Sequence, residues 1–158
     1  MSRRLAGANA FQGVAETLLS WDGMLHLTIQ QFMSRSPHTI AHDQPLTAAH
    51  KLMRAHDIRH LPVLDGGQLV GLLSQRDLHL IESLEDVDPD QVTVSEAMTT
   101  DVFAVAPRAS LRKVATEMAT RKLGSAVVVD DNAIVGVFTT IDALDVLVSV
   151  LQTQGPAL

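Results

Sequence analysis

The sequence predicts a mixed α/β (α+β) fold made of two β-α-β-β-α units that are related by a pseudo-twofold axis. The first observation behind this prediction is that the 158-residue chain repeats itself without a gap at the interval of 65 residues that separates Thr28 from Thr93. The second is that both copies carry the same order of apolar runs, helical stripes and turn residues. The matched pairs include Met33 and Met98, Gly71 and Gly136, and Asp77 and Asp142. Each copy alone would be only marginally stable, so one unit is expected to bury its apolar face on the other.

The composition excludes several functional classes. Hydrophobic residues make up 46% of the chain but aromatic residues only 3%, so the core is expected to be aliphatic. The net charge of −6 argues against a general nucleic-acid binder, which needs a basic face. Because the chain has no cysteine, it has no disulfide, thiolate zinc site or cysteine nucleophile.

The sequence indicates no membrane association and a cytoplasmic location. No run of about 18 apolar residues is present, so no transmembrane helix is expected. The polar residues Asn9, Gln12 and Glu16 interrupt any signal-peptide core near the N-terminus.

Five segments are predicted along the chain. They are a leader helix in residues 1–27, a first unit in 28–84, an acidic solvated linker in 85–92, a second unit in 93–152 and a tail in 153–158. The leader carries Phe11, Val14, Leu18 and Leu19 at helical spacing and then Trp21. We expect it to pack on the repeats or on a second copy of the protein.

The first unit is predicted to begin with a helical turn that Thr28 caps, followed by a short strand near Ile40. A helix follows Pro45 and ends near His56. The run 61–64 is typical of a buried strand, 65–67 of a hairpin turn, 69–73 of the returning strand and 75–84 of a closing helix.

The second unit is predicted to repeat this order. Thr93 caps its first helical turn, a strand lies near 103–105, and Ser110 caps a helix over 111–121. Strands over 126–129 and 134–138 flank a turn at 130–132, and a helix with an apolar stripe spans 141–152.

Each hairpin ends in the same chemical string, which is Gly-x-x-hydroxyl-x-x-Asp over 71–77 and over 136–142. A glycine inside a strand permits close approach by another backbone or a ligand. The hydroxyl falls beside the unpaired N–H groups of a helix start, which favour phosphate, and the aspartate can accept hydrogen bonds from a ribose. Ser/Thr-x-x-Asp is also a capping box, so one copy alone would be structural; the duplication of the whole string favours a ligand role as well.

This tandem arrangement over residues 28–148 resembles a pair of CBS (cystathionine-β-synthase-type) domains, also called a Bateman module. The resemblance implies that two units pack through three-stranded sheets, and that clefts between them bind adenosyl ligands such as AMP, ADP, ATP or S-adenosylmethionine. It also implies a homodimer.

The same resemblance implies two sets of ligand-binding residues. The first set is Ser34, Ile40, Ile58, Arg59, His60, Ser74 and Asp77, with Arg76 beside it. The second set is Thr99, Val105, Leu123, Gly124, Ser125, Thr139 and Asp142. The first copy has Arg59, His60 and Arg76 at the positions where the second copy has Gly124, Ser125 and Ile141. We therefore expect two unequal sites, and we expect phosphorylated ligands to prefer the site beside Arg76.

Three other interpretations compete for this sequence. His56 and His60 are four residues apart, but no further ligand completes a metal site, so the six histidines of the first unit are interpreted as surface or cleft residues, with His60 able to sense pH. No nucleophile–base pair, P-loop or dinucleotide fingerprint indicates an enzyme. The remaining alternative is a ligand-free dimerisation or interaction scaffold.

The sequence therefore predicts a regulatory module rather than a catalyst. We expect it to bind an adenine nucleotide or S-adenosylmethionine, to dimerise, and to act in trans on an unidentified protein partner.

Overall fold

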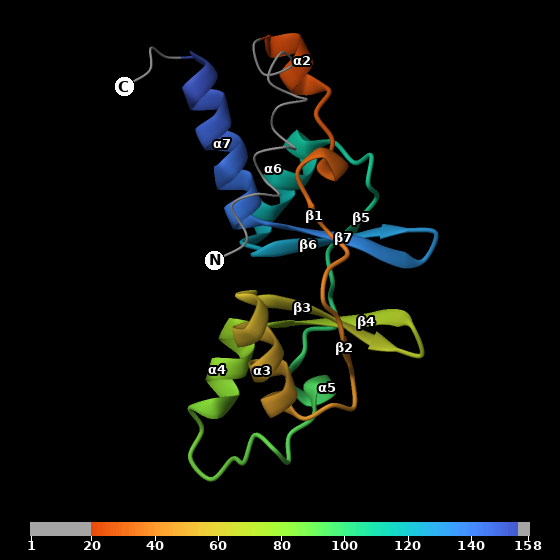
Figure 1. Cartoon of the computed structure of the whole chain (residues 1–158), viewed down its shortest axis with the longest axis vertical. Helices are drawn as coiled ribbons and strands as arrows, with labels where there is room; N and C mark the ends of the chain where they lie inside the picture. Colours follow the sequence, from red (N-terminus) through yellow and green to blue (C-terminus); the bar gives the residue numbers. More distant parts are fainter. Residues whose placement is uncertain (1–19, 155–158) are drawn as a thin grey trace. The chain divides into compact units, whose positions relative to one another are not determined.

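The computed structural model describes residues 20–154, which form two compact units (Figure 1). Unit 1 contains the described residues up to 35, residues 104–130 and those from 135 onward; unit 2 contains 36–103 and the turn 131–134. Each unit thus combines most of one repeat with the methionine segment of the other, since Met33 belongs to unit 1 and Met98 to unit 2. The predicted leader positions Phe11, Val14, Leu18 and Leu19 lie outside the described residues.

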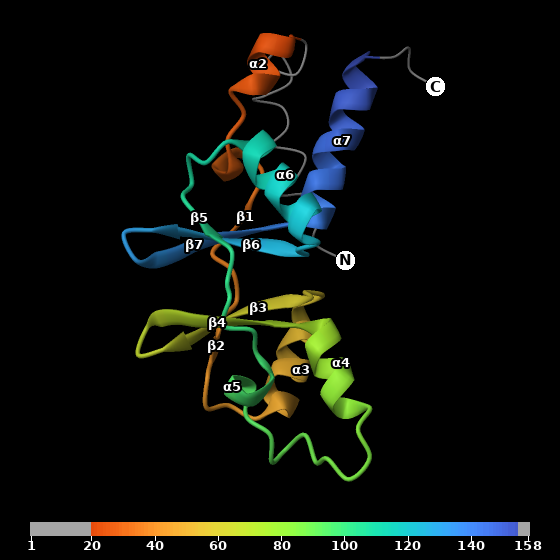
Figure 2. The same cartoon turned by 180° about the vertical axis from the view of Figure 1, so that it is seen from behind.

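Unit 2 has a three-stranded sheet in the order β2-β3-β4. Its strands are β2 (Ile40–Ala41), β3 (His60–Asp65) and β4 (Gln68–Ser74), and its helices are α3 (Leu46–His56), α4 (Gln75–Glu82) and α5 (Val94–Ala97). Strand β2 pairs parallel with β3, and β3 forms an antiparallel hairpin with β4. Helices α3 and α4 lie on the same side of this sheet (Figure 2).

Unit 1 has a four-stranded sheet in the order β1-β7-β6-β5. Its strands are β1 (Ser34–Arg35), β5 (Ala104–Val105), β6 (Ser125–Asp130) and β7 (Ala133–Thr139), and its helical elements are α2 (Trp21–Leu25), η2 (Ile29–Gln31), α6 (Leu111–Arg121) and α7 (Thr140–Gln154). The implied three-stranded sheet is wrong for this unit, because β1 adds a fourth strand by pairing Ser34 with Val137 and Arg35 with Gly136. The corresponding segment of unit 2 makes only one bridge, between Leu72 and Thr99.

The helices predicted within the two repeats and both hairpin turns are confirmed. Helices α3 and α6 have the predicted bounds, α4 ends two residues earlier than predicted, and α7 begins one residue earlier and ends two residues later. Gly66 and Gly67 adopt φ values of 54° and 84°, and the matching turn between β6 and β7 has Asp131 at 45° and Asn132 at 63°. Two successive positive φ values are characteristic of the two-residue turn that continues the twist of a hairpin.

The motif glycines are explained by the methionine segments. A Cβ atom at Gly71 would lie 2.3 Å from the sulfur of Met98 and 3.0 Å from the carbonyl oxygen of Thr99. A Cβ atom at Gly136 would lie 2.4 Å from the sulfur of Met33. The close approach that these glycines permit is therefore made by a methionine side chain and a backbone carbonyl.

The cores of both units are mainly aliphatic, as predicted. In unit 2, Leu46, Leu61 and Leu73 are fully buried, and in unit 1 Ile29 and Phe138 are fully buried. None of the helices within residues 20–154 is long and apolar enough to cross a bilayer.

Candidate ligand-binding junctions

In unit 2 the predicted serine and aspartate meet where β4 becomes α4. The Asp77 N–H donates to Ser74 Oγ at 3.1 Å, and the Ser74 N–H donates to Asp77 Oδ2 at 3.0 Å. The Ser74 hydroxyl also donates to Oδ2. Among the described residues no hydrogen bond reaches Asp77 Oδ1, so the second carboxylate oxygen can accept a hydrogen bond from a ligand.

Unit 1 has the same arrangement where β7 becomes α7. The Thr139 N–H and hydroxyl donate to Asp142 Oδ2 at 2.7 and 2.9 Å, and the Asp142 N–H donates to Thr139 Oγ1 at 3.4 Å. Both strings are therefore capping boxes, which confirms the structural role that the sequence allowed for them. All four side chains are partly buried.

The predicted strand-start residues lie beside these junctions. In unit 2 the Gln75 N–H donates to the Arg59 carbonyl at 2.8 Å, and His60 pairs with Ser74 across the hairpin. In unit 1 the Thr140 N–H donates to the Gly124 carbonyl at 3.1 Å. These hydrogen bonds hold the first residue of each closing helix against the start of its hairpin.

Ile58 and Leu123 hold the equivalent place before each hairpin. The Ile58 N–H donates to the Met53 carbonyl at 3.0 Å, and the Leu123 N–H donates to the Met118 carbonyl at 2.8 Å. Ile40 and Val105 lie further along their sheets, because they pair with Val63 and Val128 respectively. The side chain of Ile40 belongs to the buried core of unit 2.

Ser34 and Thr99 lie in the units opposite to those that the sequence-based grouping assigned. Thr99 exchanges two backbone hydrogen bonds of 2.9 Å with Leu72 and therefore accompanies Ser74 and Asp77 in unit 2. Ser34 pairs with Val137 and therefore accompanies Thr139 and Asp142 in unit 1. The grouping differs from this pairing because each methionine segment joins the sheet of the other repeat.

The two junctions differ in charge, as the sequence indicated. Arg59 and Arg76 are exposed beside the unit 2 junction, where unit 1 has Gly124 and the exposed Ile141. Burial lowers the pKa of His60; the Asp77 carboxylate raises it in part, and Arg59 lowers it further. The neutral form of His60 is therefore favoured.

Unit 1 has a buried serine at the position of His60. Ser125 is 4% exposed, and its Oγ has no hydrogen-bond partner within the described part of the chain. A buried hydroxyl without a partner is costly, so a bound molecule or water that paired with it would stabilise the unit.

The histidines of the first repeat do not gather around one point. His56 stacks on His38 with a ring-centroid distance of 3.6 Å, and His50 Nδ1 lies 2.7 Å from Glu82 Oε1. Within residues 20–154 no three His, Cys, Asp or Glu side chains are arranged to hold a metal ion.

A family model for the CBS domain matches residues 29–81 and 94–149. This chain belongs to the CBS-domain family. It is 30% identical over 110 residues to the CBS domain-containing protein YhcV of Bacillus subtilis, a match that covers 70% of this chain and 78% of YhcV. The resemblance found in the sequence is thereby confirmed.

Two solved structures share the fold of this CBS pair. AcuB from Vibrio cholerae is 35% identical with a TM-score of 0.72, and the match covers 82% of this chain and 96% of AcuB. The CBS domain pair of protein MJ0100, solved in complex with 5′-methylthioadenosine and S-adenosyl-L-methionine, is 27% identical with a TM-score of 0.68, covering 77% of this chain and 95% of that pair.

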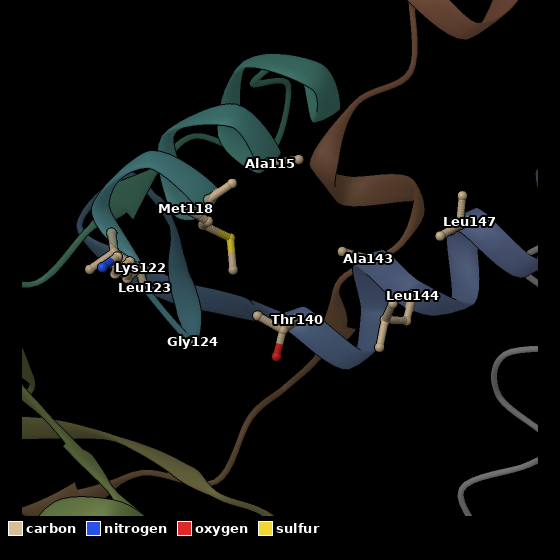
Figure 3. A pocket seen from close by; sticks show the side chains of 10 residues that line it. Ala115, Met118, Lys122, Leu123, Gly124, Thr140, Ala143, Leu144 and Leu147 are labelled. Atoms are coloured by element: carbon tan, nitrogen blue, oxygen red, sulfur yellow. The ribbon is translucent and has the colours of Figure 1, made fainter.

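One feature of the second CBS repeat was missed by the sequence reasoning. A cavity of about 590 Å³ lies between α6 and α7 (Figure 3). Its lining residues are Ala115, Met118, Ala119, Lys122, Leu123, Gly124, Thr140, Ala143, Leu144 and Leu147. The signal was present in the alignment of the two copies, because His50 and Leu78 of the first copy are replaced by the smaller Ala115 and Ala143.

Proposed function

We propose that this CBS pair is a regulatory module that binds an adenosyl ligand, an adenine nucleotide (AMP, ADP or ATP) or S-adenosylmethionine, at its strand-to-helix junctions. The observation that carries this proposal is the Ser74–Asp77 pair. One carboxylate oxygen is fixed by the helix cap, while Oδ1 is left to accept a hydrogen bond from a ribose hydroxyl. The MJ0100 pair, solved with two adenosyl compounds, supports this class of ligand.

The ligand contacts proposed for the two units differ. In unit 2 Asp77 binds the ribose, Ser74 and the α4 N-terminus bind phosphate together with Arg76, and the residues 58–60 border the base. In unit 1 Asp142 and Thr139 have these roles, and Ser125 supplies a buried hydroxyl. Thr99 completes the contacts of unit 2, because it pairs with Leu72 of the motif strand β4. Ser34 completes the contacts of unit 1, because it pairs with Val137 of the motif strand β7.

The proposed output is a change in protein contacts rather than a reaction. Both motif carboxylates are engaged in helix caps, which suits ligand recognition better than proton transfer. Ligand binding would shift the population of conformations and alter the surface offered to an unidentified protein partner in the cytoplasm.

We also propose a homodimer formed through the helices. On α7, Ile141 is 52% and Val148 is 49% exposed, and they lie seven residues apart on one face of the helix. Sedimentation of the wild-type chain and of a Val148→Glu variant tests this contact. We expect the variant to be monomeric at concentrations at which the wild type is dimeric.

A thermal-shift panel of AMP, ADP, ATP and S-adenosylmethionine tests the ligand proposal. A ligand that binds only the folded state stabilises it by about 2.7 kcal/mol at 100 times its dissociation constant. If none of the four ligands raises the melting temperature, the ligand-free scaffold becomes the better explanation.

The chain supplies a matched control for the site residues. Asp77, Asp142 and Glu96 are all the acidic members of capping boxes, and Glu96 caps the short helix α5 with Thr93. We expect Asp77→Asn combined with Asp142→Asn to weaken ligand binding by at least about tenfold, because hydrogen bonds to a charged group are lost. Glu96→Gln should leave the affinity unchanged, since it removes a capping acid that takes part in neither strand-to-helix junction.

A further inference from the structure

Helix α7 presents an apolar stripe along its length. Ile141, Leu144 and Val148 recur at the spacing of one helical face, and Leu151 continues that face by a further turn. Together with Leu147, these side chains are between 49% and 62% exposed. A row of large apolar side chains that stays in contact with water marks an interaction site.

The matching positions of the first copy are polar. The repeat interval aligns Ile141 with Arg76, Leu144 with His79, Leu147 with Glu82, Val148 with Ser83 and Leu151 with Asp86. Helix α4 does expose Leu80, but its neighbours on that face of the helix are the polar residues at 76, 79 and 83. The continuous apolar stripe is therefore a feature of unit 1 and not of unit 2.

The cavity between α6 and α7 extends this apolar surface toward α6. Figure 3 shows Met118 of α6 on one side of it and Leu144 and Leu147 of α7 on the other. The small side chains of Ala115 and Ala143 also line the cavity and leave room in it. An apolar side chain from outside the unit can therefore enter between the two helices.

The helices of unit 2 are joined at the matching place. His50 and Leu78 stand where unit 1 has the two small alanines. The Nδ1 atom of His50 lies 2.7 Å from Glu82 Oε1, which connects α3 to α4. An incoming apolar side chain would have to displace this polar contact.

The charges of the helices favour α6 over α4 as a neighbour for a second α7. Helix α7 has two aspartates, Asp142 and Asp145, and no lysine or arginine. Helix α6 and its C-cap are mainly basic, with Glu117 set against Arg112, Lys113, Arg121 and Lys122. The end of α4 and the residues after it are acidic, with Glu82, Glu85 and Asp86. An acidic helix is attracted to the first surface and repelled by the second.

We propose that unit 1 of a second copy of this chain covers the stripe, and that α7 of each copy lies in the groove between α6 and α7 of the other. This inference rests on the homodimer proposed above and names its contact surface. The same patch serves both copies, and a self-complementary contact of this kind closes as a symmetric pair. Ile141, Leu144 and Val148 become buried together in it.

A head-to-tail contact between unit 1 of one copy and unit 2 of the other is disfavoured. It would place Arg76, His79 and Glu82 of α4 against the apolar stripe of α7. Charged and polar groups that lose water without gaining a partner are costly.

Single cysteines distinguish these contacts, because the natural chain has none. Val148→Cys places a thiol on the stripe of α7, and Ser83→Cys places one at the matching position of the first copy, which is also exposed. With a short bis-maleimide we expect Val148→Cys chains to link to each other at least about tenfold faster than Ser83→Cys chains, because contact raises the effective concentration. A mixture of the two variants should form mixed links no faster than Ser83→Cys links to itself.

The outcomes separate this inference from the homodimer itself. Mixed links that form faster than links between two Val148→Cys chains would overturn the inference and keep the homodimer, because unit 1 would then meet unit 2. A wild-type chain that sediments as a monomer would overturn both, and another part of the chain or a different protein would then cover the stripe.

A cavity-filling variant tests whether the second copy enters the groove. Ala143→Leu gives unit 1 the residue that the first copy has at the matching position, Leu78. We expect it to raise the dissociation constant of the dimer at least about tenfold, because the partner's side chains lose their place. Ala55→Leu, at an exposed position of α3, is the control and should leave the dissociation constant unchanged. An unchanged constant in Ala143→Leu would overturn the proposed contact in the groove.

Discussion

The two units share one backbone plan but use different chemistry between their helices. Unit 2 joins α3 to α4 through His50 and Glu82, whereas unit 1 leaves an apolar cavity between α6 and α7. The strand-to-helix junctions, by contrast, have the same pattern of hydrogen bonds in both units. The two copies of the repeat therefore share the capping hydrogen bonds at their junctions and differ in the contacts between their helices.

The prediction with the largest expected effect on stability tests whether the contact between motif glycine and methionine is equivalent in the two units. Gly71→Ala and Gly136→Ala each place a methyl group against a methionine sulfur and a neighbouring carbonyl, and each should lower the free energy of unfolding by about 1–3 kcal/mol. Urea denaturation measures both. A large loss in one variant with none in the other would break the equivalence.

A compensating substitution sharpens that test. Adding Met98→Ala to Gly71→Ala removes the side chain that the new methyl group would meet. We expect the two substitutions to be non-additive, because the residues touch directly.

The charge difference between the junctions is expected to have the next largest effect. Arg76→Ala should weaken ATP binding on the order of fivefold, equivalent to about 1 kcal/mol, and should leave S-adenosylmethionine binding nearly unchanged. Titration calorimetry with both ligands measures this difference. The reverse substitution Ile141→Arg should strengthen ATP binding, and two identical sites in the wild type would contradict the expected inequality.

The contact between His50 of α3 and Glu82 of α4 should contribute less to the free energy of unfolding. The side chains of His50 and Glu82 are 35% and 24% exposed, so their interaction is only partly screened by solvent. We expect a coupling of about 0.5–1 kcal/mol in a double-mutant cycle of His50→Ala and Glu82→Gln. Strictly additive effects would show that the contact does not hold α3 to α4.

The smallest effect is a difference in pH dependence between the units. Burial lowers the pKa of His60 below its ordinary value of 6.5, so the unfolded chain binds a proton more readily than the folded one. The stability due to neutral His60 is therefore complete above pH 6.5 and is lost as the pH falls below it. Ser125 at the matching position does not titrate, so the effect belongs to unit 2.

Unfolding midpoints at pH 7.5 and pH 5.5, a range chosen to bracket about 6.5, measure this contribution. His60→Asn should reduce the loss of stability between the two values. Glu96 affects stability only at a lower pH. Its hydrogen bonds with Thr93 lower its pKa from the ordinary value of 4.5, so the stability that its carboxylate contributes is lost as the pH falls below 4.5. An unchanged pH dependence in the His60 variant would refute the assignment.

The sequence by itself determined the elements and their local hydrogen bonds. The bounds of α3 and α6, the two hairpin turns and the capping pairs at Ser74 and Thr139 follow from residues a few positions apart, whose interactions do not depend on the rest of the chain. The CBS resemblance also rests on these local patterns.

Only the tertiary structure decided which repeat each methionine segment joins. Ser34 and Thr99 carry equivalent local signals, so nothing near them in the sequence tells whether each joins its own sheet or that of the other copy; the structure exchanges both. The cavity between α6 and α7 was likewise decided by packing, because it depends on the summed volume of side chains from two helices that are distant in sequence.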